Sequence, residues 1–134
     1  MIFIIGGRNQ GKLDYVMSLK QFTDKDIADC HNCSEDDVVR KCVIYNFDLL
    51  IKRLLKKYDN PDVVKETVRE IIDSNPEAII ISNEIGYGVV PTDSFDRTYR
   101  ELTGRISCDI AKRAVQVHRV ICGIGTIIKG DKND

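Results

Sequence analysis

The first twelve residues constrain the fold of this chain more than any other stretch. Ile2 to Ile5 form a short apolar, partly β-branched run that is typical of a buried strand. The run leads directly into Gly6-x-x-x-x-Gly11-Lys12, and a helical pattern follows from Gly11 to about Phe22. A strand, a glycine loop, a lysine and a helix in this order are the context of a phosphate-binding P-loop. The sequence therefore predicts an α/β, P-loop NTPase-like fold with a mostly parallel sheet flanked by helices.

The backbone of this loop determines the chemistry expected of it. Glycines allow N–H groups to turn inward around phosphate oxygens, and the helix N-terminus adds a partial positive charge. Lys12 would reach the β- and γ-phosphates of GTP or ATP, which makes it a candidate catalytic residue. The predicted nucleotide-binding residues are Gly6, Gly7, Arg8, Asn9, Gln10, Gly11, Lys12 and Leu13.

One position departs from the P-loop pattern. The residue after the lysine is normally Ser or Thr, whose hydroxyl ligates Mg²⁺, and here it is Leu13. Two interpretations stay open on these residues alone. The loop either binds a nucleotide or is an ordinary turn between strand and helix whose glycines serve close packing.

Composition sets limits on the class of protein. The 134 residues suit a single domain over 1–134, and a net charge of -1 gives no electrostatic case for nucleic acid or anionic membrane. No apolar run is long enough to span a bilayer. Five cysteines are spread along a chain without a recognisable export signal, so we expect reduced thiols and a cytoplasmic location.

A second group of candidate residues follows the predicted P-loop helix. Ile27 to Cys30 could form a short inner strand, and Asp29 near its end is a candidate Mg²⁺ ligand, because P-loop enzymes often hold the metal with a strand-end carboxylate. Cys30-His-Asn-Cys33 has the spacing of half a zinc site or of a redox pair. A second ligand pair is missing, and so is the rest of a thioredoxin-like pattern, so neither interpretation is favoured.

The remaining chain alternates helical and strand patterns. Ser34-x-x-Asp37 resembles a capping box, and the apolar spacing after it predicts one long helix that continues to Leu55. Asn60-Pro61 predicts the start of the next helix. Later elements are expected as a strand at 78–82, a helix from about Asp93 and a last core strand at 119–122.

The loop after the predicted strand 78–82 carries the next candidate. Asn83-Glu-Ile-Gly-Tyr-Gly-Val-Val-Pro91 places an acidic residue among glycines directly after a buried strand. Ligands of open parallel sheets bind at the carboxyl ends of the strands, so Glu84 is a candidate catalytic residue.

Several segments together resemble one known family. Asn83–Pro91 is similar to the N-E-[VI]-G-x-G-[IV]-V-P loop of bifunctional adenosylcobinamide kinase/adenosylcobinamide-phosphate guanylyltransferases. Arg100-Glu-Leu-Thr-Gly-Arg105-Ile106 resembles that family's R-x-x-x-G-R-[VI]-N segment, and Cys122-Gly-Ile-Gly125 resembles its terminal S-G-[IL]-G. The opening Gly6–Lys12 fits its G-G-x-x-S-G-K-S. These segments cover the first dozen residues and nearly all of the last half.

The resemblance implies an activity and an assembly. The family phosphorylates the aminopropanol hydroxyl of adenosylcobinamide and then transfers GMP to that phosphate through a guanylylated histidine. Its members are trimers of P-loop subunits, so the partners implied here are a nucleoside triphosphate, a corrinoid substrate and other copies of the chain. The family's acid-cysteine pair at a strand end is similar to Asp29-Cys30.

The departures from the family matter equally. The chain is shorter between the P-loop helix and Asp29, where the family carries its guanylylated histidine, and neither His31 nor His118 has that context. The guanylyltransferase half is therefore expected to be absent. Leu13 replaces the metal-binding hydroxyl. Two interpretations compete: an enzyme that retains kinase-type chemistry, and a non-catalytic nucleotide-binding or regulatory relative.

Overall fold

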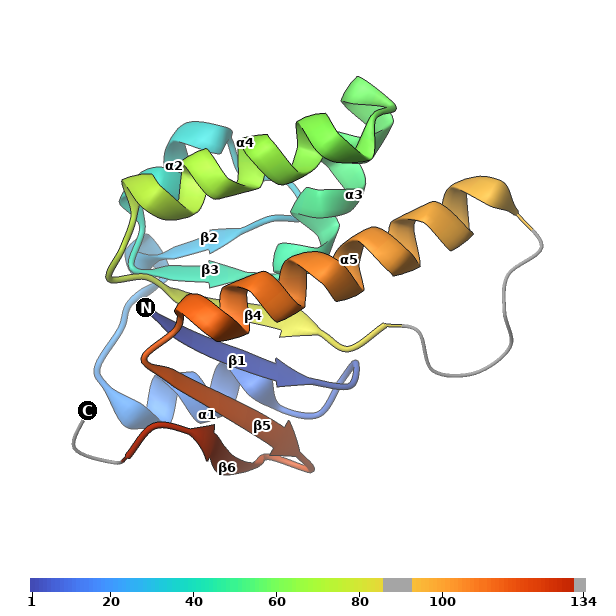
Figure 1. The fold of residues 1–134 in the computed structure, drawn as a ribbon. Helices are drawn as coiled ribbons and strands as arrows, with labels where there is room; N and C mark the ends of the chain where they lie inside the picture. The colour runs from blue at the N-terminus through green and yellow to red at the C-terminus, as the bar shows by residue number, and fades with distance from the viewer. Residues whose placement is uncertain (86–92, 132–134) are drawn as a thin grey trace.

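The architecture is an α/β sandwich built on one twisted sheet. The computed structural model describes residues 1–85 and 93–131 (Figure 1). Within them the six strands lie in the order β2-β3-β4-β1-β5-β6. All neighbouring pairs are parallel except β5 with β6, which are antiparallel. The predicted mostly parallel α/β fold is confirmed. The strands are β1 Ile2–Gly6, β2 Ile27–Asp29, β3 Val43–Tyr45, β4 Ile79–Asn83, β5 Gln116–Ile121 and β6 Ile124–Lys129.

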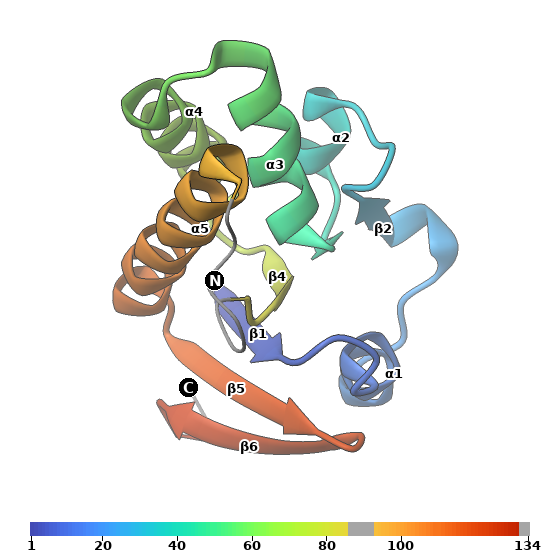
Figure 2. The same cartoon turned by 90° about the vertical axis from the view of Figure 1, so that its right-hand side faces the viewer.

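Helices cover the two faces of the sheet unequally. Helix α1 lies on one face, and α3, α4 and α5 lie on the other (Figure 2). No helix among the described residues is long and apolar enough to cross a bilayer. The helices are α1 Lys12–Leu19, α2 Glu35–Arg40, α3 Phe47–Tyr58, α4 Pro61–Ser74 and α5 Ser94–Arg113, with a 3₁₀ turn at Asp24–Asp26.

Strand β1 lies inside the sheet between β4 and β5, and both of its faces are apolar. Phe3 points into the core beneath α3, α4 and α5, whereas Ile4 points into the smaller core beneath α1. The two side chains are 2% and 0% exposed. Strands buried on both faces read as continuous apolar runs, which is why Ile2–Ile5 was recognisable from the sequence.

The predicted long helix from residue 34 to residue 55 is wrong. The structure divides it into α2, strand β3 and α3. Val43 and Ile44 point to opposite faces of the sheet, Val43 toward α1 and Ile44 toward α3. Such an alternation is a strand periodicity, but a short apolar run also fits the helical spacing of its neighbours. Asn46, in a left-handed conformation with φ 58°, then begins α3.

Two predicted helix starts are confirmed by their caps. Ser34 accepts a hydrogen bond from the Asp37 backbone N–H at 3.1 Å, and Asp37 accepts one in return. The Asn60 side chain accepts from the backbone N–H groups of Asp62 and Val63, with Pro61 at the first helical position. The P-loop helix is shorter than predicted, because α1 ends at Leu19.

A buried polar chain joins α1 to β5. His118 is 4% exposed, and its Nδ1 lies 2.6 Å from the Tyr15 hydroxyl. Its Nε2 lies 2.8 Å from Oε1 of Gln116. Tyr15 also covers Gly125 on β6, where an added Cβ would lie 2.1 Å from the Tyr15 ring. His118 therefore holds the P-loop helix against the last two strands.

The buried histidine predicts a loss of stability at acid pH. Burial lowers the pKa of His118 below 6.5, so below that pH the unfolded chain binds a proton that the folded chain does not. The free energy of unfolding should then fall by up to about 1.4 kcal/mol per pH unit as pH drops through this window. Urea unfolding of wild type and His118→Gln at about pH 7.5 and about pH 5 should show a weaker pH dependence in the variant.

A matched control is His31→Gln, whose side chain is exposed. This variant should keep the wild-type pH dependence. Equal pH dependence in wild type and His118→Gln would contradict the assignment.

Candidate functional site

The carboxyl ends of three parallel strands meet at one pocket. The loop after β1, Tyr45 at the end of β3 with Asn46 after it, and Asn83 at the end of β4 surround a polar cavity of about 690 Å³. This is where open α/β sheets bind ligands. The lining residues are Arg8, Asn9, Gln10, Gly11, Lys12, Leu13, Asp14, Tyr45, Asn46, Leu49 and Asn83.

Two glycines of the loop are required by its geometry. A Cβ on Gly6 would lie 2.4 Å from the carbonyl oxygen of Val120, because β5 passes directly beside the end of β1. Gly11 has φ 82°, a left-handed conformation that side chains disfavour, and it is the N-cap of α1. The glycine at each end thus turns the chain from strand to helix around the pocket.

The loop is anchored to the turn between β5 and β6. Gln10 accepts two backbone hydrogen bonds from this turn, one at its carbonyl oxygen from Gly123 at 2.7 Å and one at Oε1 from Cys122 at 2.8 Å. The segment Cys122–Gly125, which resembles a family motif, therefore supports the loop structurally. Where the family motif has serine, Gln10 uses its side-chain amide oxygen to accept the hydrogen bond from Cys122.

Lys12 is the buried cation of the pocket. Its side chain is 5% exposed and its Nζ donates to the carbonyl oxygen of Gly7 at 2.6 Å. Burial lowers the pKa of Lys12, while the negative charges of Asp48 and Glu84 partly offset that shift. The ammonium group therefore lies folded over the loop, where phosphate oxygens would lie in a P-loop.

Asp48 is a functional candidate that the sequence did not reveal. It is 1% exposed in the first turn of α3, and its two carboxylate oxygens accept hydrogen bonds from Asn83 at 3.2 to 3.3 Å. Its backbone oxygen accepts from the Tyr99 hydroxyl at 2.9 Å. A buried carboxylate beside a buried lysine is an arrangement that active sites use to tune charge. Strand β3 could have located Asp48, because α3 begins shortly after this strand ends. The helical periodicity of the neighbouring residues concealed the strand in the sequence.

Glu84 lies directly beside the loop but on the α5 side of β4. Its backbone N–H donates to the Gly6 carbonyl at 2.8 Å, and its Oε1 lies 3.2 Å from Nε of Arg119. With Asn83, Thr103 and Gly104 it lines a separate cavity of about 220 Å³. Asn83 borders both cavities, so Glu84 and Lys12 face neighbouring spaces. The predicted loop after Ile85, residues 86–91, lies outside the described residues.

Asp29 lies away from the P-loop, because its strand β2 is not a neighbour of β1. Strands β3 and β4 separate β2 from β1, and Asp29 does not line the pocket. Its Oδ1 accepts from Nδ2 of Asn46 at 3.1 Å and from the His31 backbone N–H at 3.0 Å. Asp29 therefore reaches the pocket through Asn46, which does line it.

Leu13 occupies the position of the missing hydroxyl. Its side chain lines the pocket and packs against the core beneath α1. Within the described residues there is no group of three or more His, Cys, Asp or Glu side chains that could hold a metal ion. A metal at this site would depend on one or two carboxylates together with the ligand's own oxygens.

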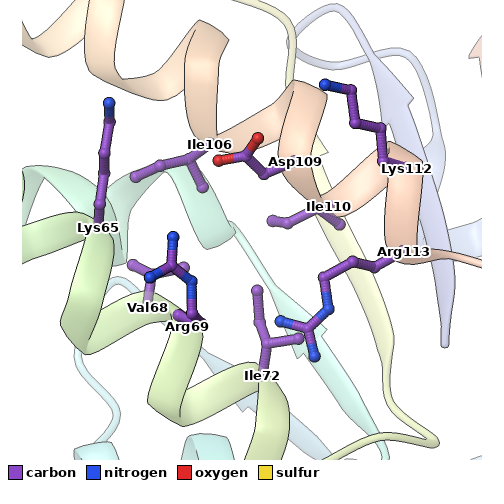
Figure 3. A pocket seen from close by; sticks show the side chains of 9 residues that line it. All are labelled: Lys65, Val68, Arg69, Ile72, Ile106, Asp109, Ile110, Lys112 and Arg113. Atoms are coloured by element: carbon purple, nitrogen blue, oxygen red, sulfur yellow. The ribbon is translucent and has the colours of Figure 1, made fainter.

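A third cavity, of about 270 Å³, lies between α4 and α5 (Figure 3). Val68 and Ile72 of α4 face Ile106 and Ile110 of α5 across it, with charged side chains around the rim. Arg113 is paired with Asp73 of α4, which joins the two helices. The cavity has no glycine loop or strand end, so it is a groove between packed helices.

The comparisons with known proteins agree with this geometry. The family model described as cobinamide kinase / cobinamide phosphate guanyltransferase matches residues 24–128. The loop Gly6–Lys12 precedes the matched residues, so its assignment depends on its own geometry. The bifunctional adenosylcobalamin biosynthesis proteins CobU of Escherichia coli K12 and Salmonella typhimurium LT2 are each 36% identical to this chain over 53 residues. That alignment covers 40% of this chain and 29% of either relative. Because the family model matches most of the sequence, the chain belongs to the cobinamide kinase / cobinamide phosphate guanyltransferase family.

Proposed function

We propose that this chain binds a nucleoside triphosphate, GTP or ATP, on the loop Gly6–Lys12. The observation that carries the proposal is the buried Lys12 ammonium folded onto Gly7 inside a polar pocket at the end of β1. A polyphosphate supplies the negative charge that a desolvated lysine favours, and the helix N-terminus adds to the attraction. The family's own substrates include nucleotides, which supports the same ligand class.

Nucleotide binding should stabilise the fold through Lys12. A ligand at 100 times its dissociation constant raises the free energy of unfolding by about 2.7 kcal/mol. Lys12→Ala should lose most of this increment with GTP and with ATP, measured as the ligand-induced shift in thermal unfolding. The matched control is Lys20→Ala at the exposed end of α1, which should keep the shift. No shift in wild type at millimolar nucleotide would contradict the proposal.

The reaction we propose is transfer of the terminal phosphoryl group to the hydroxyl of a corrinoid such as adenosylcobinamide. Lys12 would neutralise charge on the transferred group, and Asn83 and Asp48 would keep the lysine's surroundings fixed. Glu84, beside the loop, would accept the proton from the attacking hydroxyl, provided that its pair with Arg119 opens. The chain would then be an NTP-dependent kinase.

The family's chemistry implies Mg²⁺, and the residues present can hold it only with a reduced set of ligands. Asp48 and Asp29 do not line the pocket: Asp48 lies buried against Asn83, and Asp29 reaches the pocket only through Asn46. Mg²⁺ usually keeps several waters and takes one or two carboxylates plus phosphate oxygens, so we propose that these carboxylates would act on the ion only through such waters. When bound, the ion would neutralise charge on the phosphates.

Restoring the hydroxyl tests the metal site. In wild type, nucleotide should bind without Mg²⁺, and phosphoryl transfer should be slow. Leu13→Ser should allow Mg²⁺ to tighten nucleotide binding and to raise turnover, measured by calorimetric titration and by a coupled kinase assay with cobinamide. Leu13→Ala serves as the control, because it removes the same bulk without adding a ligand. If Leu13→Ser responds to Mg²⁺ no more than Leu13→Ala, the site has lost more than one ligand.

We also propose that the guanylyltransferase step is absent. Both ring nitrogens of His118 have partners, Tyr15 and Gln116, and the ring is buried. His31 lies in the exposed turn after β2 and does not line the P-loop pocket. Neither histidine among the described residues is placed to attack a nucleotide bound at Lys12.

We therefore expect that the chain forms no covalent intermediate with GMP. Incubation with labelled GTP followed by denaturing electrophoresis should leave the chain unlabelled, whereas a family member with the histidine run in parallel should be labelled. Label that disappears in His31→Ala would show that this residue is the nucleophile and that the deletion lies elsewhere.

A second function, nucleotide binding without catalysis, is favoured by Leu13. It predicts tight binding of GTP or ATP with no cobinamide phosphorylation, even for Leu13→Ser. We propose a homo-oligomer, a trimer by family resemblance, for either function. Turnover with cobinamide separates the two functions.

A further inference from the structure

The pair Cys30 and Cys33 is a second chemical feature that the proposed nucleotide chemistry does not use. We propose that Cys30 and Cys33 form a reversible dithiol–disulfide centre that hydroperoxides oxidise, and that its state alters the adjoining nucleotide pocket. Both cysteines are free thiols in the structure. The second half of the proposal rests on the proposed nucleotide function.

The backbone brings the two cysteines into one tight turn. The carbonyl oxygen of Asp29 accepts from the N–H groups of Asn32 at 3.1 Å and Cys33 at 2.9 Å. The turn closes like one turn of helix, in which side chains three residues apart lie on the same side. Both cysteines belong to the same buried core cluster. The two thiols therefore lie on one side of a closed turn, and a disulfide requires the turn to tighten rather than to rearrange.

The surroundings make the two thiols unequal. Arg53 of α3 donates to the Cys30 carbonyl at 3.1 Å, which places its guanidinium beside the turn. The neighbouring Cys30 thiol and the positive charge of Arg53 lower the pKa of Cys33, against the opposing effects of burial and Asp37. The neighbouring Cys33, burial and the charge of Asp29 raise the pKa of Cys30. Cys33 is therefore the more acidic of the two thiols.

Access to the sulfurs agrees with the same division. Cys33 is 9% exposed, whereas Cys30 is fully buried. An opening this small favours a reagent close to the size of water over a bulky disulfide. A hydroperoxide is therefore the class of oxidant that we assign to the site.

The chemistry takes two balanced steps. The Cys33 thiolate attacks one peroxide oxygen, the O–O bond breaks, and a sulfenic acid and an alkoxide or hydroxide result. The Cys30 sulfur then attacks the Cys33 sulfur, its thiol proton leaves with the sulfenic hydroxyl as water, and the S–S bond forms. A small dithiol reverses the process by thiol–disulfide exchange.

The turn is connected to the nucleotide pocket by two contacts. The Cys30 backbone N–H donates to the carbonyl oxygen of Tyr45 at 2.8 Å. Asp29, whose carbonyl closes the turn, accepts the Asn46 side chain at 3.1 Å. Tyr45 and Asn46 both line the pocket. Tightening of the turn therefore acts on two residues of the pocket wall.

The experiment uses the whole chain with its three exposed cysteines replaced by serine (Cys42→Ser, Cys108→Ser and Cys122→Ser). Hydrogen peroxide at neutral pH should remove both remaining thiols together, with the loss of two hydrogens by intact mass, and dithiothreitol should restore them. Adding Cys30→Ser should trap a sulfenic acid on Cys33 that dimedone labels. Unreacted thiols, or Cys33 sulfinic acid without a disulfide, would overturn the centre.

Arg53→Gln provides a test that leaves both sulfurs in place. Without the guanidinium, the pKa of Cys33 should rise, which lowers the thiolate fraction at pH 7 and slows oxidation severalfold. Lys56→Gln removes an exposed cation from the same helix and should react at the wild-type rate. Equal rates in the two variants would overturn the role of Cys33 as the attacking thiolate.

The coupling is tested by GTP titration of the reduced and the oxidised protein. We expect the dissociation constants to differ by about fivefold, with no peroxide effect in the Cys30→Ser, Cys33→Ser double variant. Equal constants would overturn the coupling. If neither form binds GTP, the proposed nucleotide function fails, and the thiol measurements alone decide the redox centre.

Discussion

The burial of one positive charge organises the functional edge of this fold. Transferring an ammonium group out of water is costly unless hydrogen bonds and opposite charges compensate. At Lys12 the compensation comes from the Gly7 carbonyl and from the fields of Asp48 and Glu84. Each of these groups is held by a different element: the loop after β1, the first turn of α3 and the end of β4. Asp48 is in turn fixed by Asn83 and, through its backbone, by Tyr99 of α5. The charge on Lys12 therefore requires strands and helices from both halves of the chain to be in place.

How far the sequence could predict this arrangement depends on how local each signal is. Strand β1, the loop and α1 follow one another within twenty residues, so pattern and spacing were enough to place Lys12. Strand β3 was missed, because three apolar residues between two helices satisfy both periodicities. Asp48 was missed with it, since its burial depends on Asn83, which is distant in sequence. A carboxylate within a predicted long helix gives no sign that a strand end will cover it.

The same reasoning explains where Asp29 and Glu84 lie relative to the P-loop. Asp29 was predicted near the end of a strand and Glu84 directly after one, and both do lie at the carboxyl edge of the sheet. Strand order cannot be read from such patterns, and two strands turn out to separate β2 from β1. Glu84 is adjacent to the loop because β4 pairs with β1, but its side chain turns toward α5 and Arg119. Position along a strand was predictable, whereas the neighbour and the facing side depended on the tertiary fold.

The departures from the family pattern fall at positions with different physical consequences. Gln10 uses its side chain to bind the turn between β5 and β6, so the loop keeps its support from the last strands. Leu13 adds apolar surface to the core beneath α1 and removes a hydroxyl from the pocket. Neither change touches the backbone N–H groups, the left-handed Gly11 or the lysine, which are the groups that we propose bind a polyphosphate. A phosphate oxygen that replaces the Gly7 carbonyl as the partner of Lys12 exchanges a neutral acceptor for a charged one, and hydrogen bonds between charged partners are the stronger kind. The changes thus remove a hydroxyl that a metal could use and preserve the groups that we propose bind a polyphosphate.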